Sequence, residues 1–528
     1  MKVREVDYLA LLTAVICIGL GVASHNALNP DGVSYLDLAT RLRDGDWQHF
    51  VQGYWSPLYP LIIALAATIT GRDGPELIGL VHVVNTLIAL FGVAVVWWAA
   101  RRSGSPLFGR TAFAAFLVCS AEAPRLEAVT PDLLLVAIVA LIGGEQIFFR
   151  GSRWIRLGVW MGLAFLVKTS MWPWLLAALI VRLAAARSAE RHLEVAKSAA
   201  VGVLVMALWV IPLSVKSGAP TLGSAARLNA CWYMRECDSR SPDTHSGEHR
   251  SYQQVTLGSS VATATRLSDT PWTYAPWSDP TAWAEGIITA RRVTPDLGQH
   301  ALYGAKELAL VIGIWMPHIW LGLLLPIAFL TRRSGALREL RREQADAGVV
   351  MALGIFGVLQ FVPVHVEPRL VAPFVLLFTL GALAWLTGAA GPLAKVHGSR
   401  GLVLVLSCLG FVAALPRAAI HGRDQWDVAV HTAERATMIA NAQGGPPAGN
   451  GSPRRIAVIG EVFPLLSEIF RLGRTVDVQL FRPSVPDILT WPPGDQQALL
   501  NWLGAQGVAE AWLSKSGGAF TILPVQAP

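Results

Sequence analysis

The chain has 528 residues, of which 53% are hydrophobic and only 15% are charged. A soluble globular domain carries about 25% charged residues, so the composition excludes that class and favours a polytopic membrane protein. The formal net charge of +7 does not indicate a nucleic-acid partner, because the Lys and Arg residues sit beside the hydrophobic blocks.

Apolar blocks recur along the first four fifths of the chain. A helix needs about 20 apolar residues to cross a hydrocarbon core of roughly 30 Å. On this basis we predict a polytopic α-helical membrane protein with about eleven transmembrane helices. Their approximate ranges are 8–24, 77–99, 106–121, 133–149, 154–168, 171–186, 197–215, 305–330, 347–364, 370–390 and 401–418.

The distribution of basic residues predicts the orientation of these spans. The Arg101–Arg102 pair and the Arg332–Arg342 cluster fall on the same side as the basic N-terminus, whereas the alternate loops hold few cations. Cytoplasmic loops carry the excess of Lys and Arg. We therefore expect the N-terminus in the cytoplasm and Asp31 outside.

This orientation depends on two local interpretations. The apolar block Leu61–Thr70 is short and is preceded by Pro57 and Pro60, so we expect a helix that lies in the outer interface instead of crossing. A turn is expected at Lys168–Ser170, because one long helix there would invert every later span.

In addition to the loop at about 25–76, two segments, 216–300 and 420–528, are expected outside the membrane. Residues 1–419 form the predicted transmembrane catalytic domain, including a second external loop at about 216–300. Residues 420–528 form a predicted extracytoplasmic α/β domain. Its pattern of apolar strands and amphipathic helices consists of strand Arg455–Gly460, helix Phe463–Arg471, strand Val476–Leu480 and helix Gln496–Gly504.

The five cysteines fall into two groups. Cys17, Cys119 and Cys408 lie in predicted spans, where they act as small apolar residues. Cys231 and Cys237 share the external loop, where a disulfide is favoured over two free thiols, although both remain open.

Ionisable residues gather at the predicted external ends of the spans. Asp31 follows the first span, Asp132 opens the fourth, Lys168 lies between two spans, and Glu367 and Arg369 open a late one. Charged groups at membrane depth are costly and are functional candidates by default.

Several of these polar residues also have a purely structural interpretation. Asp37 fits an exposed position on an interfacial helix, and Asp44 and Asp46 fit a solvated loop or helix end. Arg369 and Lys168 could extend toward the interface from their helix ends.

Four further residues likewise allow a structural interpretation beside the functional one. Glu127 could pair with Arg125 at the surface, His365 is typical of a structural hydrogen-bonding histidine, and Asp132 could cap the following helix. Asp31 has the weakest structural explanation. It is therefore the leading catalytic candidate.

Short motifs at these positions carry a family resemblance over roughly the first 420 residues. They are Asp31-Gly32-x-x-Tyr35-x-x-x-Ala39, Gly45-Asp46-Trp47, Pro57-Leu58-Tyr59-Pro60, Thr130-Pro131-Asp132 and Glu367-x-Arg369. With them the chain resembles the GT-C superfamily of polyprenyl-phosphate-sugar-dependent glycosyltransferases. The nearest branch holds protein O-mannosyltransferases, aminoarabinose transferases of lipid A and Rgt-type lipopolysaccharide glycosyltransferases.

The resemblance implies an inverting transferase with Asp31 as the general base. Arg369 and Lys168, then Arg125, are expected to stabilise the departing phosphate. The full set of expected substrate-binding residues is Tyr35, Tyr59, Glu122, Arg125, Asp132, Lys168, Glu367 and Arg369. One departure is Ser56, which stands where relatives of the aminoarabinose-transferase type carry a lysine.

The implied partners are a polyprenyl-phosphate sugar donor, the lipid bilayer, and a glycan, lipid or protein acceptor. The sequence assigns no definite cofactor, and metal dependence stays open because Glu122 and Asp132 could help to hold a divalent cation. A multi-pass position in a bacterial inner membrane is expected. The alternative is a transporter or flippase of lipid-linked saccharides, a class that usually shows related halves and helices broken near the midplane.

Aromatic residues in the 216–300 loop allow two interpretations. Trp272, Tyr274 and Trp277 could stack on sugar faces, or they could anchor the loop at the headgroup region. Anchoring is favoured.

Overall fold

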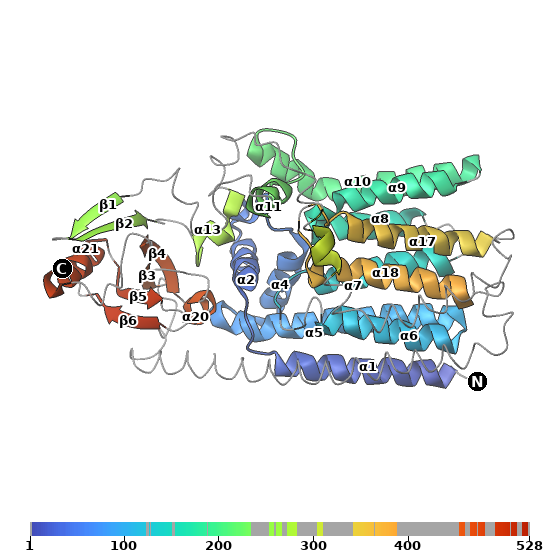
Figure 1. The fold of residues 1–528 in the computed structure, drawn as a ribbon, viewed down its shortest axis with the longest axis horizontal. Coiled ribbons are helices and arrows are strands. Elements are labelled where there is room, and N and C mark those ends of the chain that lie inside the picture. The colour runs from blue at the N-terminus through green and yellow to red at the C-terminus, as the bar shows by residue number, and fades with distance from the viewer. Residues whose placement is uncertain are drawn as a thin grey trace.

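The structure is a computed structural model. It describes residues 3–122, 126, 128–149, 154–186, 188–233, 253–257, 260–266, 272–281, 302, 304–309, 342–363, 365–387, 454–459, 465–472, 474–480, 492–506, 508–514 and 520–525. A bundle of long helices occupies one end and a β-sheet the other, with short helices between them (Figure 1). The N-terminus lies at the end of the bundle farthest from the sheet.

The described part of the bundle contains nine long helices, which match nine of the predicted spans. By length and composition α1, α5, α10 and α18 can each cross a membrane, and several shorter apolar helices accompany them. The other two predicted spans, 305–330 and 401–418, lie outside the described residues except for 305–309. The nine are α1 (Val3–Ala23), α5 (Leu77–Ser103), α6 (Pro106–Leu117), α7 (Asp132–Phe148), α8 (Trp154–Val167), α9 (Trp172–Ala185), α10 (Ala189–Ser217), α17 (Arg342–Leu359) and α18 (Pro368–Thr387).

Local signals in the sequence explain where these helices begin and end. The hydroxyl of Ser105 accepts a hydrogen bond from the backbone N–H of Phe108 at the start of α6 (3.3 Å). Such caps satisfy amide groups that lack a partner in the first turn. At the other end, α5 and α10 stop at Gly104 and Gly218, whose φ values of 63° and 70° are left-handed. Glycine adopts this conformation without steric cost.

The predicted turn at Lys168 is present. α8 ends at Val167, a short 3-10 helix spans Thr169–Met171, and α9 begins at Trp172. Trp154 at the start of α8 and Ala185 at the end of α9 line the same hollow. The two helices therefore form a hairpin, which places Lys168 at its tip on the sheet side of the bundle (Figure 1).

α8 packs against α10 through small residues. A Cβ atom on Gly162 would lie 2.5 Å from Cβ of Val205, and one on Gly158 would lie 2.5 Å from the carbonyl oxygen of Ser198. Both distances are shorter than any real contact, so only glycine allows this approach. The Gly158-x-x-x-Gly162 spacing is the small-residue pattern that lets membrane helices pack backbone to backbone.

Short helices form a layer between the bundle and the sheet. α2 (Pro30–Arg43), α3 (Trp47–Phe50) and α4 (Leu58–Thr70) follow α1 directly, and α11 (Ala225–Tyr233) and α13 (Ala275–Ser278) lie beside them (Figure 1). The ammonium of Lys216, at the end of α10, donates to the carbonyl oxygens of Gln48 and Val51 (2.6 Å each) and so ties α3 to the bundle.

α4 has the properties expected of an interfacial helix. Its 13 residues span about 20 Å at 1.5 Å per residue, which is too short to cross the membrane. Leu61, Leu65 and Ile69 form one exposed apolar stripe, whereas Tyr59 and Ile63 are buried. One face therefore contacts the protein while the other is free to meet lipid.

The sheet has six strands in the order β1-β2-β4-β3-β5-β6. β3 pairs in parallel with both β4 and β5, and α20 (Leu466–Arg471) and α21 (Pro493–Ala505) connect these strands. The elements predicted in 420–528 are thus present. The strands are β1 (Gln253–Leu257), β2 (Ser260–Arg266), β3 (Arg454–Ile459), β4 (Arg474–Leu480), β5 (Glu510–Ser514) and β6 (Phe520–Pro524).

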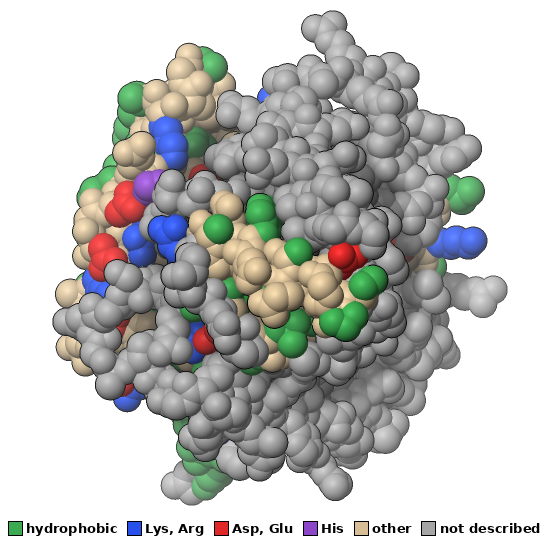
Figure 2. All heavy atoms as spheres, turned by 90° about the vertical axis from the view of Figure 1, so that its left-hand side faces the viewer, with side chains coloured by type: hydrophobic (Ala, Val, Ile, Leu, Met, Phe, Trp, Pro, Cys, Tyr) green, Lys and Arg blue, Asp and Glu red, His purple; other side chains and the backbone are tan. Residues whose placement is uncertain are grey.

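The sheet also contains a hairpin that comes from the 216–300 segment. β1 and β2 pair antiparallel, and β2 adds antiparallel to β4. The C-terminal domain is therefore completed by strands from the transmembrane part of the chain. Seen from the sheet end, acidic and basic side chains lie close together on one side of the face (Figure 2). The described part of this face shows no uniformly charged patch.

Replacing Gly162 with Val should destabilise the bundle by about 1–3 kcal/mol, because the added methyl groups would force α8 away from α10. Thermal unfolding of the detergent-solubilised protein measures this. Gly19→Val is the matched control, since a Cβ atom on Gly19 meets nothing within 4 Å. Equal melting temperatures for the two variants would contradict the packing described for α8.

Candidate active site

Asp31 lies in the first turn of α2, which differs from the loop position expected for it. Asn29 is the N-cap of this helix and Pro30 its first residue. Proline favours the first helical position because its missing N–H has no helical partner there. The side chain of Asp31 is 19% exposed, and its Oδ2 accepts a hydrogen bond from Nη1 of Arg369 (2.9 Å).

Arg369 is held between two carboxylates. Its Nη1 donates to Asp31, and its Nε donates to Oε2 of Glu367 (2.6 Å). The expectation that Arg369 extends freely toward the interface is therefore wrong, because both bonds turn the guanidinium back over α2. Since 338 positions separate Arg369 from Asp31, α18 must pack at the start of α2 for this pair to form.

His365 extends the cluster as a structural residue, in agreement with that interpretation of the sequence. Its Nε2 lies 2.9 Å from Oε1 of Glu367, and its Nδ1 lies 3.4 Å from Oε2 of Glu307. Burial alone would raise the pKa of Glu367, but the bonds from His365 and Arg369 outweigh it and lower that pKa to about 2. Glu367 therefore stays ionised and keeps Arg369 oriented.

A second ion pair joins Lys168 and Asp132. Nζ of Lys168 donates to Oδ1 of Asp132 (2.5 Å), whose side chain is only 1% exposed. Lys168 therefore points into the protein, which corrects the expectation that it could extend to the interface. Pro131, and not Asp132, is the N-cap of α7, and no side-chain capping bond is formed there.

Ser56 supports the turn that carries Lys168. Its hydroxyl accepts a buried hydrogen bond from the backbone N–H of Thr169 (2.8 Å). Ser56 thus helps to hold the turn next to Lys168 in place.

Two buried tyrosines lie between the ion pairs. The rings of Tyr35 and Tyr59 pack edge to face with centroids 5.2 Å apart. Burial raises the pKa of Tyr35, and the charges of Asp31 and Asp132 raise it further. Both carboxylates therefore act electrostatically on the same phenol.

Tyr59 and Asn85 fix the segment that leads to Asp132. The hydroxyl of Tyr59 donates to Oδ1 of Asn85 (2.7 Å). Nδ2 of Asn85 donates in turn to the carbonyl oxygens of Leu126 (3.4 Å) and Ala128 (3.3 Å). The two tyrosines, predicted to bind substrate, are buried and support the charged groups.

The start of α2 approaches this same segment closely. Oδ1 of Asn29 accepts a hydrogen bond from the backbone N–H of Val129 (2.9 Å). A Cβ atom on Gly32 would lie 2.7 Å from Cβ of Val129. Gly32, beside Asp31 in the motif, is therefore required so that the Asp31 helix can reach the Asp132 segment.

Asp37 is buried, and the expectation of an exposed position is wrong. Its Oδ2 accepts from the backbone N–H of Thr273 (2.9 Å) and the hydroxyl of Ser278 (2.7 Å), and its Oδ1 accepts from the hydroxyl of Thr273 (2.7 Å). Burial raises the pKa of Asp37 to about 6 although the hydrogen bonds from Ser278 and Thr273 lower it. The carboxylate fixes the 272–278 segment on α2. The sequence offered no signal for this role, because the partners lie more than 230 residues away.

The loop aromatics also differ from the favoured expectation. Trp272 and Tyr274 are buried in the protein, so they do not anchor the loop among lipid headgroups. The carbonyl oxygen of Trp277 accepts hydrogen bonds from Nε1 of Trp55 (3.0 Å) and the hydroxyl of Ser34 (3.2 Å). These residues secure the loop to α2 and to the segment before α4.

Some predicted residues cannot be placed. Arg125, Glu127, Cys237 and Cys408, together with the side chains of Glu122 and Cys231, lie outside the described residues. Cys17 and Cys119 are buried thiols outside any disulfide, as expected of small apolar residues. The described residues contain no group of three His, Cys, Asp or Glu side chains suited to a metal ion.

Comparison with solved structures identifies a shared fold. The crystal structure of ArnT from Cupriavidus metallidurans bound to undecaprenyl phosphate matches over 97% of this chain and 93% of that chain, with 14% identity and a TM-score of 0.54. The apo structure of the same protein matches over 96% and 93%, with 16% identity and a TM-score of 0.42. No protein-family model matches the sequence, and a search of curated proteins finds no match. This chain therefore shares its fold with ArnT.

Asp37→Asn should destabilise the protein by roughly 1–3 kcal/mol, because one amide oxygen replaces two carboxylate oxygens facing three donors. Thermal unfolding provides the measurement. Asp44→Asn, on a side chain that is 42% exposed, should change the stability far less. If the two variants unfold alike, Asp37 does not hold the loop.

Glu367 should contribute to acid sensitivity. Because its pKa falls from the usual 4.5 to about 2 in the folded protein, its stabilising effect is complete above pH 4.5 and is lost as the pH falls toward 2. The full effect is on the order of 3 kcal/mol at most. Melting temperatures of the native protein and Glu367→Gln should converge across this range. If the melting temperatures of the two proteins instead differ by the same amount at every pH, Glu367 is not held ionised by its partners.

Proposed function

We propose that this chain, which has the fold of ArnT, is a membrane glycosyltransferase. It would move a sugar from a polyprenyl-phosphate donor to an acceptor hydroxyl with inversion, using Asp31 as the general base. The observation that carries the proposal is the Asp31–Arg369 pair, together with the Asp132–Lys168 pair. A carboxylate base and two cations at one end of the bundle are the groups that this reaction needs.

The chemistry of the donor explains the choice of a single base. A sugar on a lipid phosphate already carries a good leaving group, so no general acid is required. A hydroxyl acceptor is a weak nucleophile, and a carboxylate that removes its proton accelerates transfer by about 10²–10⁴. One carboxylate that activates the acceptor opposite the departing phosphate gives inversion.

Arg369 links donor binding to the availability of the Asp31 carboxylate, because it donates a hydrogen bond to Oδ2 of Asp31. In the structure its guanidinium is divided between Asp31 and Glu367. A donor phosphate offers a stronger, doubly hydrogen-bonded partner for a guanidinium. When the phosphate takes over this contact, Oδ2 of Asp31 is released to accept the proton of the acceptor hydroxyl, whereas Glu367 continues to orient Arg369. Base activation would thus follow donor binding.

Lys168 supplies a second positive charge beside the phosphate. It is 22% exposed and held by Asp132, with Ser56 supporting the turn behind it. Preorganised cations of this kind stabilise charge that develops on the leaving group. Because Oδ1 of Asp132 already accepts from Lys168, Asp132 fits a divalent cation poorly and no step is assigned to one.

The arrangement favours an enzyme over a transporter. Asp31, Lys168 and Arg369 lie at the sheet end of the bundle, at or next to helix ends. Transporters place their substrate-binding groups near the bilayer midplane at broken helices. Under the predicted topology the reaction lies on the outer side of a bacterial inner membrane, and the acceptor is a glycan, a lipid or a protein.

Asp31→Asn provides the test. Mass spectrometry of cell-envelope glycans and lipids, with and without the protein, first identifies the donor and the product. Release of polyprenyl phosphate by the purified enzyme then gives the rate. We expect the Asn variant to lose about 10²–10⁴-fold in kcat while still binding the donor, because Arg369 keeps Glu367 as its partner.

The matched control is Asp44→Asn, an exposed carboxylate at the far end of the same helix. It should turn over like the native protein. A native rate in the Asp31 variant would rule out Asp31 as the base. Movement of lipid-linked saccharide across vesicles without sugar transfer would support the transporter instead.

A further inference from the structure

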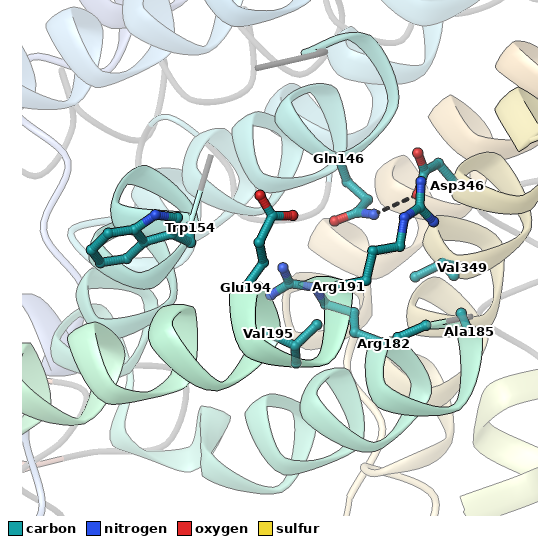
Figure 3. A pocket seen from close by; sticks show the side chains of 10 residues that line it. Gln146, Trp154, Arg182, Ala185, Arg191, Glu194, Val195, Asp346 and Val349 are labelled. Carbon is teal, nitrogen blue, oxygen red and sulfur yellow. Dashed lines mark hydrogen bonds between the residues drawn. The ribbon is translucent and has the colours of Figure 1, made fainter. Parts of the chain in front are cut away.

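A small open hollow with an internal volume of about 50 Å³ lies at the end of the bundle opposite Asp31. Five helices meet there: the ends of α7 and α9 and the beginnings of α8, α10 and α17. Figure 3 shows that the side chains of Arg182, Arg191, Glu194 and Asp346 all face this space. The sugar-transfer chemistry assigned above makes no use of these groups.

The walls of the hollow are built by specific contacts. Oδ1 of Asp346 accepts from Nε2 of the buried Gln146 (2.9 Å), which joins α17 to α7 (Figure 3). Nη1 of Arg182 donates to the hydroxyl of Ser198 (3.3 Å) and contacts the sulfur of Met161 (3.7 Å). These bonds place one cation and one anion in defined positions on opposite sides.

The first turn of α10 supplies a second pair of opposite charges. Arg191 and Glu194 are three residues apart and both are partly buried. Two guanidinium groups suit a phosphodiester. Two carboxylates suit an ammonium group. A headgroup that carries both charges matches this lining better than a purely anionic one.

The position of the hollow gives a lipid access to it. α9 exposes Leu176 and Ile180, and α10 exposes Leu193, Val203 and Leu204, so both helices that carry the arginines present apolar surface. Trp154 at the rim lies with its ring 5.5 Å from Nζ of Lys197, and such aromatic and basic groups are typical of the headgroup region.

We propose that this hollow binds the zwitterionic headgroup of an aminophospholipid such as phosphatidylethanolamine. The phosphate lies against Arg182 and Arg191, and the primary ammonium lies against Glu194 and Asp346. Under the predicted topology this lipid belongs to the cytoplasmic leaflet. It holds five helix ends together at the side of the membrane away from Asp31, and its binding does not depend on sugar transfer.

Native mass spectrometry of the delipidated full-length protein tests the proposal. Phosphatidylethanolamine, phosphatidylcholine and phosphatidylglycerol with identical acyl chains are added in turn. We expect phosphatidylethanolamine to bind about fivefold more tightly than phosphatidylcholine, because a quaternary ammonium cannot donate hydrogen bonds to the carboxylates. Equal binding of these two lipids would overturn the assignment.

Two substitutions test the ammonium and the phosphate contacts of the headgroup separately. Glu194→Gln should remove the preference for phosphatidylethanolamine over phosphatidylcholine. Arg191→Gln should weaken all three lipids by about fivefold. Arg182 is not substituted in this test, because its bonds to Ser198 and Met161 also support the fold.

Arg101→Gln is the matched control, because Arg101 lies at the same end of the bundle and pairs with Asp7 (2.9 Å) outside the hollow. It should bind each lipid like the native protein. Equal loss in the Arg101 and Arg191 variants would show a nonspecific charge effect and refute the site. Soluble glycerophosphoethanolamine or inorganic phosphate that bound as tightly as the lipid would likewise refute a lipid site.

Discussion

The architecture of the candidate site depends on one constraint: charged groups near the membrane must be paired. Arg369 meets this constraint through two carboxylates, the neighbouring Glu367 and the distant Asp31. Removing one partner of such a pair leaves a costly unpaired charge, so the pairing itself holds α18 against the start of α2. The same bonds keep the cation that a phosphate would need in position before any substrate arrives.

A second consequence concerns the link between the reaction site and the sheet. Asp37 on α2 binds Thr273, and the carbonyl oxygen of Thr273 accepts from the backbone N–H of Val476 on β4 (3.0 Å). A guanidinium nitrogen of Arg471 on α20 donates to the carbonyl oxygen of Asn26, just before α2. The helix that carries Asp31 is thereby fixed from both the loop and the C-terminal domain. The domain can therefore shape the space above the carboxylate, where an acceptor would enter.

The two ends of the bundle use charge differently. At the end that carries Asp31, Glu367 accepts directly from Arg369, and Ser56 and Asn85 hold the backbone next to Lys168 and ahead of Asp132. This is the rigid support that a catalytic group requires. At the opposite end, Arg191 and Glu194 line an open hollow. In the two proposals, one end would bind a phosphate that reacts and the other a phosphate that stays bound.

The sequence alone determined the helices, because a span or an interfacial helix follows from local length and hydropathy. It also identified Asp31, Asp132, Lys168 and Arg369, since a charge beside an apolar block is visible without coordinates. Only the tertiary structure decided which charges pair, that Asp37 is buried, and that strands from the 216–300 segment enter the C-terminal sheet. These features join residues separated by up to hundreds of positions, and no local pattern records which distant partner satisfies a hydrogen bond or a charge.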